Sequence, residues 1–335
     1  MKTPCCLSAL LAAAWLAAAA AVAAADAAPA TPARRDPQAP ADLRLKWPAG
    51  RPQHQRLSLT MNTETGGGPT PGPVRQDVAL SMEYTLAPAG LREGGGQELE
   101  MTLGDLDMAV SSGGREVLRF DTRAAAAGGE TGTATLMRGL VGVRLKCLLN
   151  ASNRVERVEG WRDPLRQASA SAPAAGRGAM ASILTEDYFR QLADFGRMLP
   201  QRVVRPGESW TNQQEISLGP LGRVILDLAY TFKAWETRAG QDCAAVAFTG
   251  TARSGAPGAG APSPFGRLNV EDGRISGTYW FNPQEGRMVE AALQQDLTLG
   301  VDLPALPGAP DKAPGKITSR FRQKTDLKCS VPAPR

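Results

Sequence analysis

The sequence has little of the chemistry that most enzymes use, since His54 is the only histidine among 335 residues. Histidine is the most frequent general base and the commonest metal ligand in proteins. One imidazole excludes His-rich metal sites and any nucleophilic triad that is not built on His54. His54 follows the turn-like residues 50–53, and we expect it at an exposed strand position. No Gly-x-Ser-x-Gly elbow occurs, and the glycine runs 66–68 and 94–96 separate strands rather than opening a phosphate-binding helix.

Acids are common in this chain, so a pair of them close in sequence is weak evidence for catalysis. Asp105 with Asp107, and Glu271 with Asp272, are close in sequence and could serve a glycosidase on that ground alone. A calcium loop needs an oxygen-rich run, whereas the surroundings of Asp105 are hydrophobic. We therefore predict no catalytic residue, no metal site and no cofactor, and keep an exported hydrolase as the third hypothesis for function.

Nucleic-acid binding is disfavoured by the way charge is distributed. The chain has 38 Lys and Arg against 33 Asp and Glu, a net charge of +5, but the two signs alternate along it. Proteins that bind phosphate backbones gather their basic residues on one face. Groups such as Arg320, Arg322 and Lys324 fit a solvated strand face, and we predict no nucleic-acid partner.

The N-terminus is typical of an export signal. Lys2 precedes an apolar run over residues 7–25, and three alanines stand before Asp26. We predict a signal peptide over residues 1–25; a retained membrane anchor is the alternative, because the run is nearly long enough to span a bilayer. No second long apolar run follows, so the cleaved chain has no predicted integral span and is exported, to the periplasm or outside the cell. Residues 26–42, rich in Ala and Pro, are predicted to form a disordered leader.

Cysteine content is low, and only Cys147, Cys243 and Cys329 remain after cleavage. An oxidising compartment favours pairing of thiols. We predict a Cys243–Cys329 disulfide with Cys147 as a small buried thiol, and three unpaired core thiols are the alternative.

Alternation of apolar and polar residues with period two dominates from residue 43 onward, as in half-buried antiparallel strands. It is clearest over residues 77–86. In residues 98–110 the alternation changes phase at Gly104 and Asp105, which predicts a β-bulge. We divide the chain into a β-rich first half (43–161), a low-complexity connector (162–181), an amphipathic helical segment (182–199) and a β-rich second half (200–331).

The helical segment carries apolar residues at helical spacing, with Thr185 as N-cap and Pro200 as its stop. This predicts a helix over residues 185–199 that either packs on a sheet or covers a cavity. The strands of the second half are long, as in curved sheets and barrels. The predicted fold class is α+β, mainly β: long curved antiparallel strands forming an open barrel or two half-barrels, with one covering helix.

The most distinctive string is PQRVVRPGESW at residues 200–210, in which Pro206 and Gly207 suit a type II turn and Trp210 enters a strand. It is similar to a string shared by an uncharacterised family of exported bacterial proteins, a domain of unknown function. Cys243-Ala244 and the run from Gly277 to Phe281 extend the resemblance. That resemblance implies an order of strands and a compartment rather than an activity. The architecture also loosely resembles the unclosed barrel of LolA/LolB-type lipoprotein carriers.

The leading hypothesis for function is a non-enzymatic envelope protein that binds an apolar or lipid-like ligand in a barrel cavity. The alternative is a scaffold or assembly module that recognises another envelope protein through exposed strand edges. The alternative for the inward side chains is that they simply fill the core. The predicted cavity-lining residues are Met82, Tyr84, Met101, Phe189, Phe195, Leu226, Leu228, Tyr230, Phe232 and Leu293.

Overall fold

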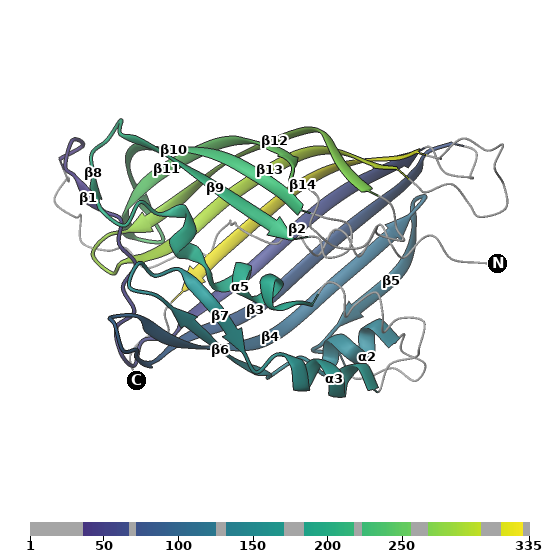
Figure 1. Ribbon diagram of the computed structural model, residues 1–335, viewed down its shortest axis with the longest axis horizontal. Helices are drawn as coiled ribbons and strands as arrows, with labels where there is room; N and C mark the ends of the chain where they lie inside the picture. Colours follow the sequence, from purple (N-terminus) through teal and green to yellow (C-terminus); the bar gives the residue numbers. More distant parts are fainter. Residues whose placement is uncertain are drawn as a thin grey trace.

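Long antiparallel strands make up most of the chain in the computed structural model, which describes residues 36–66, 72–124, 132–170, 184–217, 223–255, 267–302 and 316–330. Two of the strands, β1 (Ala41–Asp42) and β8 (Val203–Val204), pair only with each other. The others form one twelve-stranded sheet (Figure 1). Its strands are β2 (Gln53–Gly66), β3 (Val74–Leu91), β4 (Gln97–Ser112), β5 (Arg115–Asp121), β6 (Arg144–Leu149), β7 (Val155–Glu159), β9 (Ser209–Ser217), β10 (Arg223–Arg238), β11 (Gln241–Ser254), β12 (Arg267–Asn282), β13 (Arg287–Asp302) and β14 (Lys316–Ser330).

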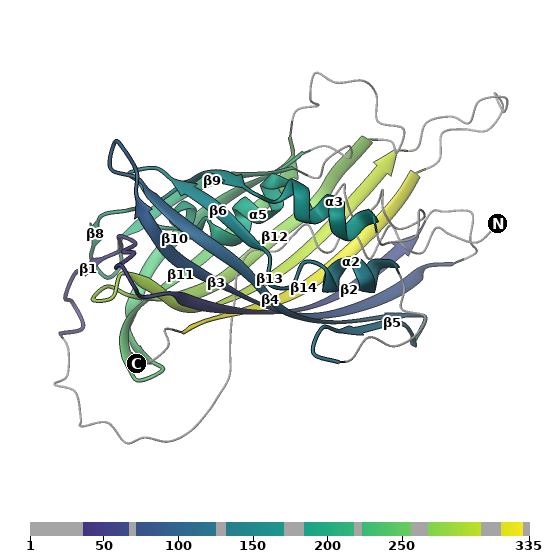
Figure 2. The ribbon, with the colours of Figure 1, turned by 90° about the horizontal axis from the view of Figure 1, so that it is seen from below.

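The sheet has the order β7-β6-β4-β3-β2-β14-β13-β12-β11-β10-β9. Strand β5 lies off this path and pairs with the C-terminal part of β4. The last strand, β14, pairs antiparallel with the first long strand, β2, so the two halves of the chain share one sheet. Figures 1 and 2 show this sheet curling around an open side. The predicted open barrel is confirmed, and the alternative of two separate half-barrels is not.

The inner face of the sheet is apolar because successive side chains of a strand point to opposite faces. On β10, Val224, Leu226 and Leu228 are buried, while the residues between them are at least partly exposed. Buried side chains from both halves of the chain, Leu57 and Leu293 among them, belong to the same core cluster. Each such burial stabilises the fold by about 1.5–3 kcal/mol.

The change of phase in β4 is a β-bulge, as predicted. Met82 of β3 pairs with Leu106, and Tyr84 pairs with Leu103, so Gly104 and Asp105 together face the single residue Glu83. Beyond the bulge the inward positions move from odd to even numbers, which keeps the apolar side chains of β4 on the inner face.

The turn before Trp210 is also as predicted. Gly207 has φ +88°, and the amide N–H of Glu208 donates to the carbonyl of Arg205 at 3.0 Å. A type II turn needs positive φ at its third position, where glycine is free of strain. The turn delivers Trp210 to β9, the last strand of the sheet.

The predicted helix over residues 185–199 is only half correct. Helix α5 (Glu186–Ala193) begins at the predicted N-cap, where Thr185 Oγ1 accepts from Tyr188 N at 3.3 Å. It ends at Asp194, and η1 (Phe195–Met198) continues as a 3-10 turn. Two tertiary contacts account for the early end. The Asp194 carboxylate accepts a hydrogen bond from β7, and Gly196 lies so close to the carbonyl of Asn153 that any side chain there would collide with it.

Two further helices, α2 (Gly132–Arg138) and α3 (Arg162–Ala170), have no counterpart in the sequence prediction. The first part of the expected connector thus forms α3, where Leu165 and Ala168 are buried. Residues 171–181 of that connector lie outside the described ranges. The end of the expected leader is likewise ordered, because Ala41 is buried in strand β1. The predicted signal peptide and residues 26–35 lie outside the described ranges.

The predicted Cys243–Cys329 disulfide is wrong. Cys147, Cys243 and Cys329 are all free and buried. Strands β12 and β13 separate β11 from β14, so three strand spacings place the two residues about 14 Å apart. Disulfides need Cα atoms within about 7 Å. The two thiols also face opposite sides of the sheet, since Cys329 belongs to the inner core and Cys243 packs with Trp280 and Val289 in a separate cluster.

These thiols should be unreactive until the protein unfolds. Burial raises the pKa of each of them to about 12, which at pH 8 leaves a thiolate fraction on the order of 1 in 10,000, against about a quarter for a free cysteine. We expect iodoacetamide to leave the native mature chain unlabelled and to label three sites in denaturant without prior reduction. The labelling rate of the native chain should rise about tenfold per pH unit above pH 8. A native thiol that reacts as fast as free cysteine would contradict the described burial.

Candidate functional site

The two end strands of the sheet, β7 and β9, are bridged by a helical segment rather than by each other. Helix α5 contacts β7, and η1 contacts β9. Figure 1 shows α5 on the open side of the sheet, between these two edges. We call residues 185–199 the seam segment, because they connect the edges of an otherwise open barrel.

Carboxylates of the seam segment occupy the edge of β7. The amide N–H of Val155 donates to Asp194 Oδ1 at 3.3 Å, and that of Val158 donates to Glu186 Oε1 at 3.1 Å. Arg154 Nε adds an ion pair to Asp194 at 3.2 Å. These side chains take the place of the strand that an open sheet edge would otherwise attract.

Side chains from the inner face hold the backbone of the seam segment. The Tyr84 hydroxyl of β3 donates to the carbonyl of Leu192 at 2.9 Å. The carbonyl of Met198 accepts from the Tyr279 hydroxyl of β12 at 3.2 Å and from Trp210 Nε1 of β9 at 3.4 Å. The segment is therefore fastened to several strands by hydrogen bonds between side chains and backbone.

The predicted cavity-lining residues all lie in the core of the structure. All ten are buried, and all ten belong to the main core cluster. They come from β3, β4, β10, β13, α5 and η1. That they contact a ligand stays a prediction.

Tyr230 is the centre of an aromatic cluster, of which only Tyr230 was among the predicted cavity-lining residues. The ring of Tyr230 stacks on Trp210 at 5.7 Å between centroids, and Phe248 and Tyr279 lie 5.5 Å and 6.2 Å away. Phe248 and Tyr279 were not among the predicted site residues. The sequence pattern could have predicted Tyr279, because Gly277, Tyr279 and Phe281 are spaced two apart along β12 and so lie on the same, inner face of the sheet.

The residue that sequence reasoning missed entirely is Arg197 of η1, which is 7% exposed. In a regular amphipathic helix an arginine is expected on the solvent side. The change from α-helix to 3-10 turn at Phe195 removes that expectation. Burial lowers the pKa of the Arg197 guanidinium, and the nearby carboxylate of Asp194 opposes this shift.

The remaining titratable candidates lie on the surface. His54 is exposed on β2, and its Nδ1 is 2.9 Å from Thr85 Oγ1. The carboxylate of Asp105 accepts from Arg123 Nε at 3.2 Å and from Thr122 Oγ1 at 3.1 Å. In the described ranges, no group of three or more His, Cys, Asp or Glu side chains is placed to hold a metal ion.

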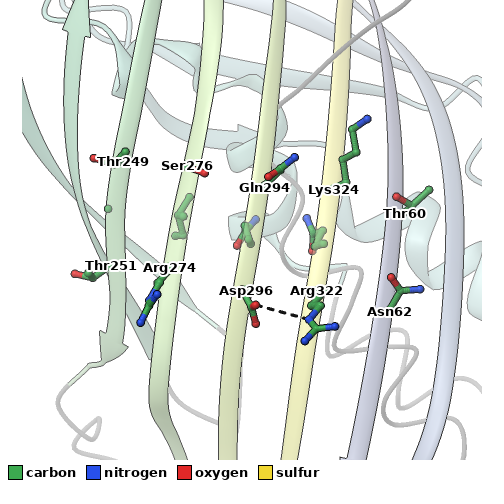
Figure 3. Close-up of a pocket in the computed structure, with 14 residues that line it drawn as sticks. Thr60, Asn62, Thr249, Thr251, Arg274, Ser276, Gln294, Asp296, Arg322 and Lys324 are labelled. Atoms are coloured by element: carbon green, nitrogen blue, oxygen red, sulfur yellow. Dashed lines mark ion pairs between the residues drawn. The ribbon is translucent and has the colours of Figure 1, made fainter.

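A groove of about 750 Å³ runs across the outer face of β11–β14 and β2 (Figure 3). The side chains that the figure labels alternate with inward positions such as Ile275 and Gln295, which are buried. Within it, Arg322 Nε lies 3.7 Å from Asp296 Oδ2, and both side chains are exposed. Exposed ion pairs contribute little to stability. The groove is open, and most of the residues that line it are polar or charged.

No protein-family model matches the chain, and no curated protein matches its sequence. Solved structures to which the chain shows similarity include an exported protein with a YmcC-like fold from Bacteroides fragilis, at 10% identity and a TM-score of 0.25, covering 83% of this chain and 97% of that one. DynF from the dynemicin biosynthesis pathway of Micromonospora chersina has 10% identity and a TM-score of 0.18, covering 87% of this chain and 85% of that one. An outer membrane lipoprotein-sorting protein domain from Vibrio parahaemolyticus has 11% identity and a TM-score of 0.15, covering 82% and 85%. Similarity at this level carries no information about function.

None of the helices within the described ranges is both long enough and apolar enough to cross a bilayer.

Proposed function

We propose that this chain is an exported, non-enzymatic protein that binds an apolar or lipid-like ligand on the inner face of its open sheet, beneath the seam segment. The observation that carries the proposal is the seam itself. A barrel closed by strand pairing is fixed along its whole ladder of backbone hydrogen bonds. Here a short helical segment bridges the edges, so the interior can open there without breaking a strand pair.

The contacts of the seam segment suit such a role. Its fastening by Tyr84, Tyr279 and Trp210 uses single hydrogen bonds to backbone carbonyls, and each contributes about 1 kcal/mol net. Met82 of β3, whose sulfur lies 4.0 Å from the Tyr188 hydroxyl of the segment, has a flexible side chain of the kind that adapts to an apolar ligand. The export signal predicted at residues 1–25 supports an envelope or extracellular location for this role.

The proposal predicts that the purified mature protein carries lipid. Organic extraction followed by mass spectrometry should recover about one apolar molecule per chain. Two tryptophan variants provide the matched comparison, because Leu228 faces inward and its neighbour Ala229 faces outward. Leu228→Trp should lower the lipid content by reducing the inner space, whereas Ala229→Trp should leave it unchanged.

The contrary result is also specific. If the inward side chains only fill a solid core, no lipid is recovered from any variant. Leu228→Trp then destabilises the fold by about 1–3 kcal/mol through overpacking, which a denaturation curve detects.

The alternative, a scaffold that recruits another envelope protein through strand edges, is supported less well. The edge N–H groups of Val155 and Val158 on β7 are already taken by carboxylates. Recovery of a lipid-free protein together with one stoichiometric protein partner would favour this alternative over ligand binding.

A further inference from the structure

The interior holds two buried arginines with opposite surroundings. Arg287, 5% exposed, donates to Glu285 Oε2 at 2.5 Å, to the carbonyl of Cys329 at 3.1 Å and to Gln241 Oε1 at 3.1 Å. Arg197, 7% exposed, has a buried Nε without a hydrogen-bond partner, and its guanidinium forms no ion pair with any described residue. A buried charge without a partner is costly, so folded proteins rarely keep one without a use for it.

Asp194, the acid that acts on Arg197, is engaged by another arginine. Asp194 receives Arg154 Nε at 3.2 Å as well as the backbone N–H of Val155. Burial lowers the pKa of the Arg197 guanidinium most; Asp194 and Tyr230 oppose that shift, and the charges of Arg154 and Arg190 add to it. Arg197 is therefore a buried cation of the seam segment that makes no ion pair within the described ranges.

Tyr230 of the inner face lies close to η1, because its ring stacks on Trp210, whose Nε1 donates to the carbonyl of Met198, the residue after Arg197. Burial raises the pKa of Tyr84 and of Tyr230, and in both cases the Arg197 charge opposes the rise. The Tyr84 hydroxyl donates its hydrogen bond to the carbonyl of Leu192. The Tyr230 oxygen accepts from Gln214 Nε2 at 3.2 Å, and its own O–H has no acceptor within the described ranges. Arg197 and Tyr230 thus supply two neighbouring donors without acceptors.

We propose that Arg197, assisted by the Tyr230 hydroxyl, binds the carboxylate or phosphate headgroup of an anionic amphiphile whose apolar chain lies along the inner face. This inference rests on the proposed function and names the class of its ligand. A guanidinium forms charge-assisted, often bidentate hydrogen bonds to either oxyanion, and these are stronger inside a protein than in water. The amphiphile would bring the missing counter-charge together with an apolar chain for the apolar inner face.

The test compares ligands that differ only in the headgroup. Palmitate, methyl palmitate and hexadecyl phosphate are titrated into the delipidated mature protein, and acetate and inorganic phosphate serve as anions without a chain. We expect palmitate and hexadecyl phosphate to bind at least about tenfold more tightly than methyl palmitate. Arg197→Gln should abolish this preference and leave the affinity for methyl palmitate unchanged. Arg190→Gln, at a partly exposed arginine of the same segment, should preserve it.

Each contrary outcome identifies what fails. Equal affinity for palmitate and its ester in the unaltered protein, or a preference that survives Arg197→Gln, overturns the headgroup site and leaves the apolar site standing. Absence of binding by every long-chain probe overturns both proposals. Acetate or phosphate binding as tightly as the long-chain anions would support the anion site and contradict the apolar one. If Arg197→Gln does not fold, Tyr230→Phe replaces it, and a preference reduced severalfold is then the supporting result.

Discussion

Replacing Gly277 with valine is expected to prevent stable folding, although Gly277 lies in the middle of a strand where valine is normally favoured. A Cβ atom at this position would lie 2.5 Å from Phe248 Cζ, and closer still to the carbonyl oxygen of Ala292. Phe248 is the direct partner of Gly277 across the β11–β12 pair, so its ring occupies the space over the glycine. Because one of the two obstacles is backbone, rotation of a side chain cannot relieve the collision. We expect a loss of more than about 3 kcal/mol.

Gly90 supplies the matched control for this prediction. It also lies in a long strand, β3, but a Cβ atom there would meet nothing within 4 Å. Gly90→Val should change the free energy of unfolding by about 0.5 kcal/mol or less. Adding Phe248→Ala to Gly277→Val should restore only part of the loss, since the collision with Ala292 persists. Urea denaturation of the four proteins measures these differences, and a Gly277→Val variant as stable as Gly90→Val would refute the explanation.

Local patterns in the sequence predicted the features that depend on local physics. Alternation identified the inward residues of β3, β4, β10 and β13, because the strand geometry fixes the side-chain period at two. The bulge at Gly104 and the turn at Gly207 were both predicted from the same kind of signal. The N-cap at Thr185 followed from a side chain that satisfies a free backbone N–H at a helix start.

Features that depend on contacts between distant segments were not predictable in this way. The helix ends at Asp194 because β7, about forty residues earlier in the chain, supplies donors to its carboxylate. The disulfide prediction failed because the spacing of Cys243 and Cys329 in sequence says nothing of the two strands inserted between them. Arg197 was missed because its burial depends on that same early end of the helix.

In the candidate site, too, the features set by local sequence were predicted and those set by contacts between distant segments were not. The inward residues were found, but the way in which the edges of the sheet are bridged was not, since nothing in β7 or β9 alone indicates that they are the end strands. The pairing of β14 with β2 decides this, because it places those strands in the centre of the sheet and leaves β7 and β9 at its ends. The seam segment then becomes the place where the two ends meet.

Replacing Asp194 with alanine should weaken the attachment of the seam segment to β7. We expect it to cause the largest loss of stability among substitutions of the charged residues of the segment. The carboxylate is 7% exposed and holds both Arg154 and the N–H of Val155. Without it Arg154, whose side chain is 45% exposed, can turn to water, but Arg197 remains buried with no nearby acid to offset its charge. Breaking a buried pair from one side costs about 3–5 kcal/mol, and the exposure of Arg154 places our expectation near 3 kcal/mol.

Asp187→Ala is the control for this prediction, because Asp187 also pairs with an arginine of the seam segment but is 38% exposed, and its loss should cost less than about 1 kcal/mol. The decisive comparison is the double variant. If Asp194 stabilises the fold partly by offsetting the Arg197 charge, then Arg197→Met should be more favourable by about 1 kcal/mol in the Asp194→Ala background than in the unaltered protein. Unfolding free energies of the four proteins give this coupling directly. Strict additivity would mean that Asp194 does not stabilise the fold by offsetting the charge of Arg197, and the loss would then come from its contacts with Arg154 and the Val155 N–H.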